Sequence, residues 1–280
     1  MKRIMIAALT LGLCLTLVAC SNNSGSTTSD TLTVGMECAY APFNWSQMDK
    51  TDTSVEIDNN KGSYCDGYDV QIAKIVADKL GKTLVIKALD WTNLESGSAV
   101  NNGTVDIIFA GMNPTPTRAQ AIDFTDAYYT SVYGIVVKTD SSFANATTIA
   151  DFKGSKLITQ TGTVQDKTFI DQVENVTHVP GTNTMPQAIS SLLNNAVDGV
   201  VVEKPVAEVA LSTNSNLKFI VFADGQGFTA EPSDLIISAG VKKNRDDNLV
   251  TQVNDILKTI TTEQRDEIMS AAQQRQPAAN

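Results

Sequence analysis

Short apolar runs alternate along the chain with amphipathic stretches that have helical spacing. Three of these runs have the length and composition of buried strands, at residues 32–36, 83–89 and 107–110. The stretch 70–80 has apolar side chains at helical spacing, and Gly81 follows it as the residue that ends the helix. Asp69 is the expected N-cap, and residues 91–99 are expected to form a shorter helix. Strand, helix, strand, helix, strand predicts a parallel α/β unit.

A second α/β unit is predicted to begin with a strand at residues 134–137. Its other strands are expected at 157–159, 197–202 and 217–222, and its helices at 164–173 and 185–195. A further strand at 235–241 and helices at 248–260 and 263–273 then return to the first unit. Lobe 1 is therefore expected to comprise residues 31–131 plus 223–274, and lobe 2 residues 132–222. Two extended crossings, near Ser131 and Ala223, are expected to form a hinge.

The composition argues against several classes of function. The 280 residues include 31 acidic and 21 basic side chains, a formal charge of -10, whereas nucleic-acid binding requires a basic face. His178 is the only histidine, which argues against histidine-dependent catalysis and histidine-rich metal sites. No glycine-rich phosphate loop lies at a strand–helix junction, so nucleotide binding is not supported. We expect neither a cofactor nor a metal.

The N-terminus has the pattern of an export signal. Lys2 and Arg3 precede an apolar run over residues 4–18, which is too short to span a membrane comfortably. Residues 17–20, Leu-Val-Ala-Cys, resemble the lipobox of bacterial lipoproteins, in which the cysteine, here Cys20, carries lipid and begins the mature chain. Residues 1–19 are then the signal peptide, and 20–30 a flexible tether rich in serine, threonine and asparagine. A plain signal peptide or a short membrane anchor is the alternative.

A polar turn after the strand at 107–110 holds the clearest candidate for ligand binding. Pro114 and Pro116 interrupt strand and helix there, and Arg118 lies just past the carboxyl end of the strand. Ligands bind at that end of the strands in open α/β sheets. An arginine in this place offers a fork of donors for a carboxylate or a phosphate. The alternative is a surface arginine that caps a loop.

The residues around Arg118 form a longer pattern, which comprises Ala110-Gly111-Met112, Thr115, Asp123-Phe124-Thr125-Asp126 and Tyr128-Tyr129. This pattern resembles the solute-binding proteins, of the family 3 type, that serve ATP-driven importers of polar amino acids. Thr117 and Asn113 depart from it, because the family usually has an acid at the first position and serine or threonine at the second. The resemblance covers nearly all of the chain after the tether. It implies an α/β, two-lobed, periplasmic-binding-protein-like (type II) fold with a hinged interdomain cleft.

The resemblance also implies that the cleft binds the two charged groups of an α-amino acid. Arg118 and the amides of the Gly162-Thr163 turn would hold the carboxylate, and Glu203 would hold the ammonium group. The residues alone leave alternatives open. The turn could be an ordinary β–α connection, and Glu203 could pair with Lys204 at the surface.

The remaining site residues implied by the resemblance surround the ligand's side chain. Tyr40 and Tyr68 would form two aromatic walls, and Glu37 would lie near the far end of the side chain. The other expected ligand-binding residues are Ala110, Gly111, Asn113 and Gln160.

Two cysteines, Cys38 and Cys65, remain once Cys14 leaves with the signal peptide and Cys20 carries lipid. Export implies an oxidising compartment, in which a disulfide persists. We therefore expect a Cys38–Cys65 bridge, which would stabilise the fold by roughly 3 kcal/mol in the chain-entropy model. Two free buried thiols are the alternative.

These observations together predict a binding protein rather than an enzyme. It would capture a free polar or basic amino acid outside the cytoplasm and deliver it to the permease and ATPase subunits of an ABC importer. A buried carboxylate at Glu37 favours arginine or lysine, because a cation satisfies it better than a neutral amide does. Glutamine is the second choice. A dehydratase-like enzyme and a sensory or adhesion lipoprotein on the same fold are the alternatives from other classes. We expect a monomer that is lipid-anchored to the bacterial cell membrane.

Overall fold

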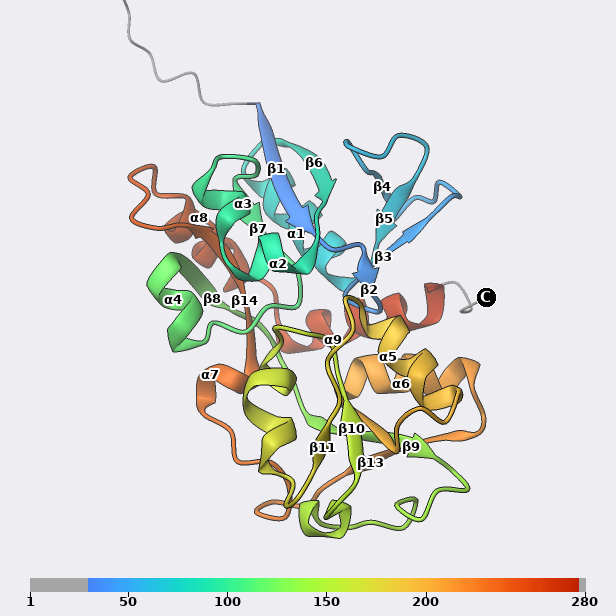
Figure 1. Cartoon of the computed structure of the whole chain (residues 1–280). Coiled ribbons are helices and arrows are strands. Elements are labelled where there is room, and N and C mark those ends of the chain that lie inside the picture. The colour runs from blue at the N-terminus through green and yellow to red at the C-terminus, as the bar shows by residue number, and fades with distance from the viewer. Residues whose placement is uncertain (1–29, 277–280) are drawn as a thin grey trace, which may run out of the picture.

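The computed structural model describes residues 30–276. Within that range the chain forms two lobes, drawn one above the other in Figure 1, each built around its own five-stranded sheet. The predicted signal peptide, its lipidated Cys20 and nearly all of the tether lie outside the described residues. No helix between residues 30 and 276 is long and apolar enough to cross a membrane.

The sheet of lobe 1 contains strands from both ends of the chain. Its strands lie in the order β6-β1-β7-β14-β8, with bounds β6 Thr83–Ala88, β1 Thr31–Met36, β7 Ile107–Ile108, β14 Ile236–Lys242 and β8 Ile122–Thr130. β1 is parallel to β6 and β7, as the alternation of strands and helices predicted, whereas β14 is antiparallel to β7 and β8. The long strand β8 was not predicted.

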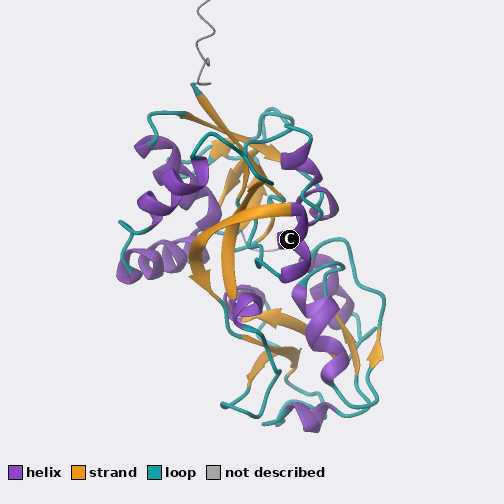
Figure 2. Ribbon diagram, turned by 90° about the vertical axis from the view of Figure 1, so that its left-hand side faces the viewer, coloured by secondary structure: helices purple, strands orange, loops and turns teal. Residues whose placement is uncertain are grey.

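The helices of lobe 1 cover this sheet, as Figure 2 shows. They are α1 Tyr68–Lys79, α2 Trp91–Glu95, α3 Ser98–Asn101, α4 Pro116–Ala121, α7 Pro232–Leu235, α8 Leu249–Leu257 and α9 Thr262–Arg275. Gly97, at a φ of 73°, divides the predicted helix 91–99 into α2 and α3. The prediction of Asp69 as an N-cap is wrong, because Gly67 occupies that position and Asp69 lies buried in the first turn of α1.

A small antiparallel sheet in lobe 1 lies beside its five-stranded sheet. It has the order β2-β3-β5-β4, with bounds β2 Ala39–Tyr40, β3 Asn44–Gln47, β5 Tyr64–Asp66 and β4 Val55–Glu56. The predicted disulfide is present. It joins Cys38, just after β1, to Cys65 in β5, with the two Cα atoms 5.7 Å apart. The bridge therefore fixes this sheet to the carboxyl end of a central strand.

The sheet of lobe 2 has the order β11-β10-β12-β9-β13. The bounds are β11 Thr177–His178, β10 Lys156–Ile158, β12 Gly199–Glu203, β9 Tyr133–Lys138 and β13 Leu217–Val221. Helices α5 Met185–Leu193 and α6 Lys204–Thr213 accompany it, with 3₁₀ turns at Ile149–Phe152 and Ile170–Gln172. The α-helix predicted over 164–173 is wrong. A π-helical turn, Gln165–Phe169, runs there into the second 3₁₀ turn, and the adjacent Phe169 and Ile170 are both fully buried.

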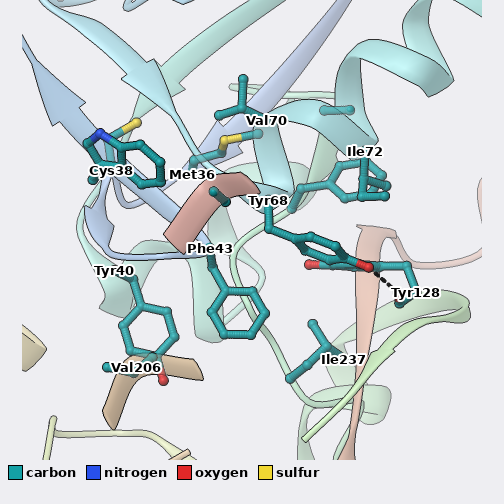
Figure 3. Packing of buried hydrophobic residues seen from close by; sticks show 14 of the residues in the cluster. Met36, Cys38, Tyr40, Phe43, Tyr68, Val70, Ile72, Tyr128, Val206 and Ile237 are labelled. Carbon is teal, nitrogen blue, oxygen red and sulfur yellow. Dashed lines mark hydrogen bonds between the residues drawn. The ribbon is translucent and has the colours of Figure 1, made fainter. Parts of the chain in front are cut away.

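The chain passes between the two sheets twice, from β8 into β9 and from β13 towards α7. Helix α9 contacts α1 in lobe 1 and α6 in lobe 2, so the C-terminal helix lies against both. Figure 3 shows the apolar core beside this junction, where Tyr40 approaches Val206 of α6 while Phe43 and Tyr68 pack deeper in lobe 1.

Candidate functional site

A narrow cavity, whose empty volume of about 280 Å³ includes space open to solvent, lies between the lobes at the carboxyl ends of strands from both sheets. Ligands bind at this end of the strands in open α/β folds. Most of the predicted ligand-binding residues meet here. Its lining consists of Glu37, Tyr40, Trp91, Ala110, Gly111, Asn113, Gln160, Thr163, Gln165 and Glu203.

Arg118 lies beside this cavity and is only 6% exposed, so it is not a surface arginine. It sits in the first turn of α4, where the hydroxyl of Thr115 accepts a hydrogen bond from its backbone N–H. Its Nη1 donates to the Asn113 carbonyl oxygen at 3.0 Å, and its Nη2 donates to that of Gly162 at 2.9 Å. The carboxylate of Glu95 lies 3.7 Å from its Nε. The guanidinium therefore holds a backbone group of each lobe.

One of the two amides expected to be free in the Gly162-Thr163 turn, that of Gly162, is already occupied. The Gly162 N–H donates to Oδ2 of Asp166 at 2.9 Å, so the protein's own carboxylate already occupies this anion position. The Thr163 hydroxyl donates to the Gln160 carbonyl oxygen at 2.8 Å. The turn thus brings Arg118 the carbonyl of Gly162 rather than an unoccupied amide.

Glu203 ends β12 and is almost completely buried. Its carboxylate accepts hydrogen bonds from the hydroxyls of Tyr40 in lobe 1 and Ser131 in the first crossing. Burial raises the pKa of Glu203 to about 7, although the two hydroxyls oppose that rise. Lys204 pairs with Glu208 instead, at 3.6 Å, so the alternative that Glu203 pairs with Lys204 is wrong. No lysine, arginine or histidine among residues 30–276 pairs with the buried Glu203 carboxylate, which suits an ammonium group.

Glu37 follows β1 and lines the same cavity. Its two carboxylate oxygens accept from Nε2 of Gln160 at 2.9 and 3.1 Å, which is a further link between the lobes. Burial raises the pKa of Glu37 to about 7; the Gln160 amide opposes the rise and the charge of Asp90 adds to it. No lysine or arginine is among the described residues that line the cavity. A cationic ligand would supply the partner that this carboxylate lacks.

The aromatic walls differ from the expectation. Tyr40 lines the cavity and stacks on Phe43, with ring centroids 5.7 Å apart. Tyr68 does not line it: the side chain is fully buried in the core, and its hydroxyl donates to the Tyr128 carbonyl oxygen at 2.7 Å. Gly67, at a φ of 136°, precedes Tyr68 at the start of α1. Trp91 is the second ring at the cavity, with the Arg118 Cζ 5.1 Å from its centroid. Trp91 follows β6, so the rule about strand ends that singled out Arg118 could have found it.

Several side chains behind the cavity hold its backbone, and Asp69 is the centre of them. Its carboxylate accepts from Asn44 Nδ2 and from the Tyr128 hydroxyl, each at 2.7 Å, and from the Gly111 N–H. Asn44 Oδ1 in turn accepts from the Cys38 N–H at 2.7 Å. Burial raises the pKa of Asp69 to about 6, against the effect of these hydrogen bonds. One buried carboxylate thus positions both the loop after β1 and the loop after β7.

Asn113 also holds backbone segments next to the cavity in place. Its side-chain amide donates to the carbonyl oxygens of Asp234 and Ile236, at 2.8 and 3.0 Å, and to the Tyr133 hydroxyl at 3.1 Å. The side-chain amide is therefore committed to the protein, and its backbone carbonyl orients Arg118. No group of acidic, histidine or cysteine residues between residues 30 and 276 has the arrangement of a metal site.

Comparison with known proteins agrees with this geometry. Residues 32–271 match the bacterial extracellular solute-binding proteins, family 3. The chain belongs to this family. Its members are non-enzymatic receptors, and those of the amino-acid ABC transporters are the relatives found here, so the protein is an extracytoplasmic amino-acid-binding component of such a transporter.

Two curated relatives and one solved structure illustrate the similarity of this family 3 protein. The arginine-binding extracellular protein ArtP of Bacillus subtilis (strain 168) is 26% identical over 92% of each chain. The glutamine-binding protein GlnH of the same organism is 25% identical, over 82% of this chain and 81% of GlnH. The structure of an ancestral arginine-binding protein bound to arginine is 26% identical, covers 86% of this chain and 97% of its own, and superposes with a TM-score of 0.68.

Proposed function

We propose that this protein captures arginine or lysine and delivers it to the permease and ATPase subunits of an ABC importer. The observation that supports this most is Glu37, a carboxylate in the interlobe cavity with a raised pKa and no cationic partner among the lining residues. A guanidinium or ammonium group would satisfy it with a charge-assisted hydrogen bond, about twice as strong as a bond from a neutral amide.

The ligand would lie across the cavity with its two ends held by different groups. Arg118 would bind the carboxylate, exchanging a bond to a backbone carbonyl for a bidentate ion pair. Glu203 would bind the ammonium group, and the aliphatic part of the side chain would lie between Tyr40 and Trp91. The side chain then reaches Glu37. Each buried ligand charge has an opposite partner, which is the condition under which burying it is tolerable.

Closure of the lobes would use the same residues. The hydrogen-bonded pairs that cross the cleft include Tyr40 to Glu203, Gln160 to Glu37, and Arg118 to the Gly162 carbonyl. We place the hinge at the two crossings between lobe 1 (31–131 and 223–274) and lobe 2 (132–222). Two-lobed proteins that enclose a small solute between their lobes close around it by a hinge motion.

Isothermal titration calorimetry with Glu37→Gln tests the specificity. In the wild type, arginine or lysine should bind more tightly than glutamine; in the variant, binding of the cation should fall at least about tenfold while glutamine binding holds or improves. Glu174→Gln makes the same charge change at an exposed surface pair with Lys153 and serves as the matched control. Wild-type protein that binds glutamine tightly and ignores arginine and lysine would overturn the choice of ligand.

Glutamine is a second candidate for a specific reason. The Gln160 amide already donates to Glu37 at 2.9 Å, and a glutamine ligand could offer the same kind of donor to that carboxylate. The names of the two Bacillus subtilis relatives, one arginine-binding and one glutamine-binding, agree with either ligand.

We also propose a lipid anchor at Cys20, on the sequence pattern of residues 17–20. Cys20→Ser should yield released protein or an unprocessed precursor. Detergent-phase partitioning and intact-mass analysis of the membrane fraction measure this. A Cys20→Ser protein that still carries lipid in its mature form would contradict the anchor.

A further inference from the structure

A second, larger cavity opens on the far side of Glu37. Its empty volume is about 1080 Å³, part of it open to solvent, against about 280 Å³ for the cavity between Arg118 and Glu37. We call it the outer cavity. Residues from both lobes line it: Glu37, Ala39, Ala88, Leu89, Asp90, Trp91, Thr92, Asn93, Thr161, Asn183 and Thr184. Glu37 and Trp91 line both cavities, so the two adjoin at the end where the ligand's side chain is expected.

The lining of the outer cavity is mixed, with apolar, uncharged polar and two acidic residues; the apolar ones are Ala39, Ala88, Leu89 and Trp91. Asp90 is exposed, and its charge is close enough to act on Glu37. Thr92 and Asn93, at the start of α2, line it from lobe 1, and Thr161 and Asn183 line it from lobe 2. No lysine or arginine is among its described lining residues. Such a lining can contact both a cationic group and short alkyl substituents on it.

We infer that the outer cavity accepts substituents on the terminal nitrogen of the ligand's side chain, so that the receptor takes N-alkylated basic amino acids as well as arginine and lysine. This inference rests on the proposed function. A guanidinium bound edge-on to Glu37 would keep its other edge towards the outer cavity and Asp90. A closed pocket rejects an added methyl group, since overpacking typically costs a factor of about ten or more in affinity. An open end carries no such penalty.

Calorimetry with matched pairs of ligands tests this on the wild-type protein. The pairs are L-arginine with Nω-methyl-L-arginine, and L-glutamine with N5-ethyl-L-glutamine. The analogue should bind within tenfold of its parent. A loss of tenfold or more for the analogue of whichever parent binds would overturn the inference.

A variant that fills the outer cavity shows where the substituent lies. Thr92 is exposed and lines only the outer cavity, so Thr92→Trp should weaken the analogue at least tenfold and leave the parent within threefold. Asn102→Trp, an equally exposed position that lines neither cavity, is the control for the added indole. Equal weakening of parent and analogue by Thr92→Trp would overturn the inference.

The two proposals fail in different ways. If arginine and lysine do not bind but glutamine does, the proposed ligand is wrong, and the glutamine pair still measures the outer cavity. If arginine binds and Nω-methyl-L-arginine loses tenfold or more, the choice of ligand stands and the outer cavity is not used.

Discussion

The affinity for a cationic ligand should depend steeply on pH, because both carboxyls proposed to hold its positive charges have raised pKa values. Burial brings the pKa of Glu37 and that of Glu203 to about 7 in the ligand-free protein. An ammonium or guanidinium partner favours the ionised form of each. Binding must therefore expel any proton that these groups hold, and affinity should fall as the pH is lowered through 7.

The magnitude follows from linkage. A carboxyl with a pKa of about 7 when free is about 90% ionised near pH 8 and about 3% ionised near pH 5.5. If it is fully ionised in the complex, the affinity falls about 30-fold between those pH values, or about 2 kcal/mol. Glu37 and Glu203 together should then lower the affinity for arginine by roughly 1000-fold. Near pH 7, where each group is half protonated, binding should release about one proton in total.

Calorimetry across this pH range, in buffers of different ionisation enthalpy, measures both the affinity and the released protons. Glu37→Gln should retain only the share of Glu203, about 30-fold. Glutamine binding should show a similarly reduced dependence in the wild type, because a protonated Glu37 can still hydrogen-bond to its neutral amide. Equal pH dependence of arginine binding in the wild type and Glu37→Gln would refute the assignment of Glu37 to the ligand's side chain.

Three other properties can be measured on the same protein. Arg118→Ala should weaken binding about 100-fold or more in calorimetry, because it leaves a buried ligand carboxylate unpaired; a loss under about fivefold would mean that the carboxylate binds elsewhere. Reduction of the Cys38–Cys65 bridge should lower the free energy of unfolding by roughly 3 kcal/mol, for a loop spanning 27 positions, and a thermal melt unchanged by reductant would contradict this. The ligand-free protein should melt at a higher temperature near about pH 5 than near about pH 7.5. Its buried carboxyls, Asp69 and Glu203 among them, have pKa values raised from 3.8 and 4.5, so the folded state binds more protons in that window and stability falls as the pH rises. A melting temperature that climbs over this range would refute that account.

Much of the fold could be predicted from the sequence because parallel strands covered on both faces read as continuous apolar runs. β1, whose apolar run is broken by Thr33 and Gly35, and β12, which is parallel to β10 but antiparallel to β9, are close to this kind. β8 is not of this kind. It lies at the edge of the sheet and carries Asp123 and Asp126. Because an edge strand tolerates charged side chains, its sequence is not an apolar run and was not identified as a strand. The π-helical turn at Gln165–Phe169 could not be predicted either, because the spacing of apolar residues does not distinguish it from an α-helix.

The site was predictable where position along a strand decides the outcome. Glu37 and Glu203 lie at or just past strand ends, Arg118 lies in α4, the helix that follows β7, and all three lie at the cleft. The prediction that Tyr68 forms a wall of the cavity failed, because the direction of this side chain depends on the rotation of α1 after Gly67. The residue types do not reveal that rotation. The prediction of a free amide at Gly162 failed because that N–H donates to the Asp166 carboxylate. The pattern of residues along the chain does not reveal such a contact between a side chain and the backbone.

The position of β14 within its sheet bears on how the chain can fold after synthesis. β14 lies between β7 and β8, where Gly240 pairs with Ile108 on one side and with Phe124 on the other. Until residues 236–242 emerge, β7 and β8 each expose an unpaired edge, and lobe 1 cannot close, whereas lobe 2 uses only a continuous segment of chain. Lobe 2 is therefore free to fold first, and lobe 1 remains open until nearly the whole polypeptide has been made. A chain destined for export gains time from such an order, because the sheet of lobe 1 is completed last.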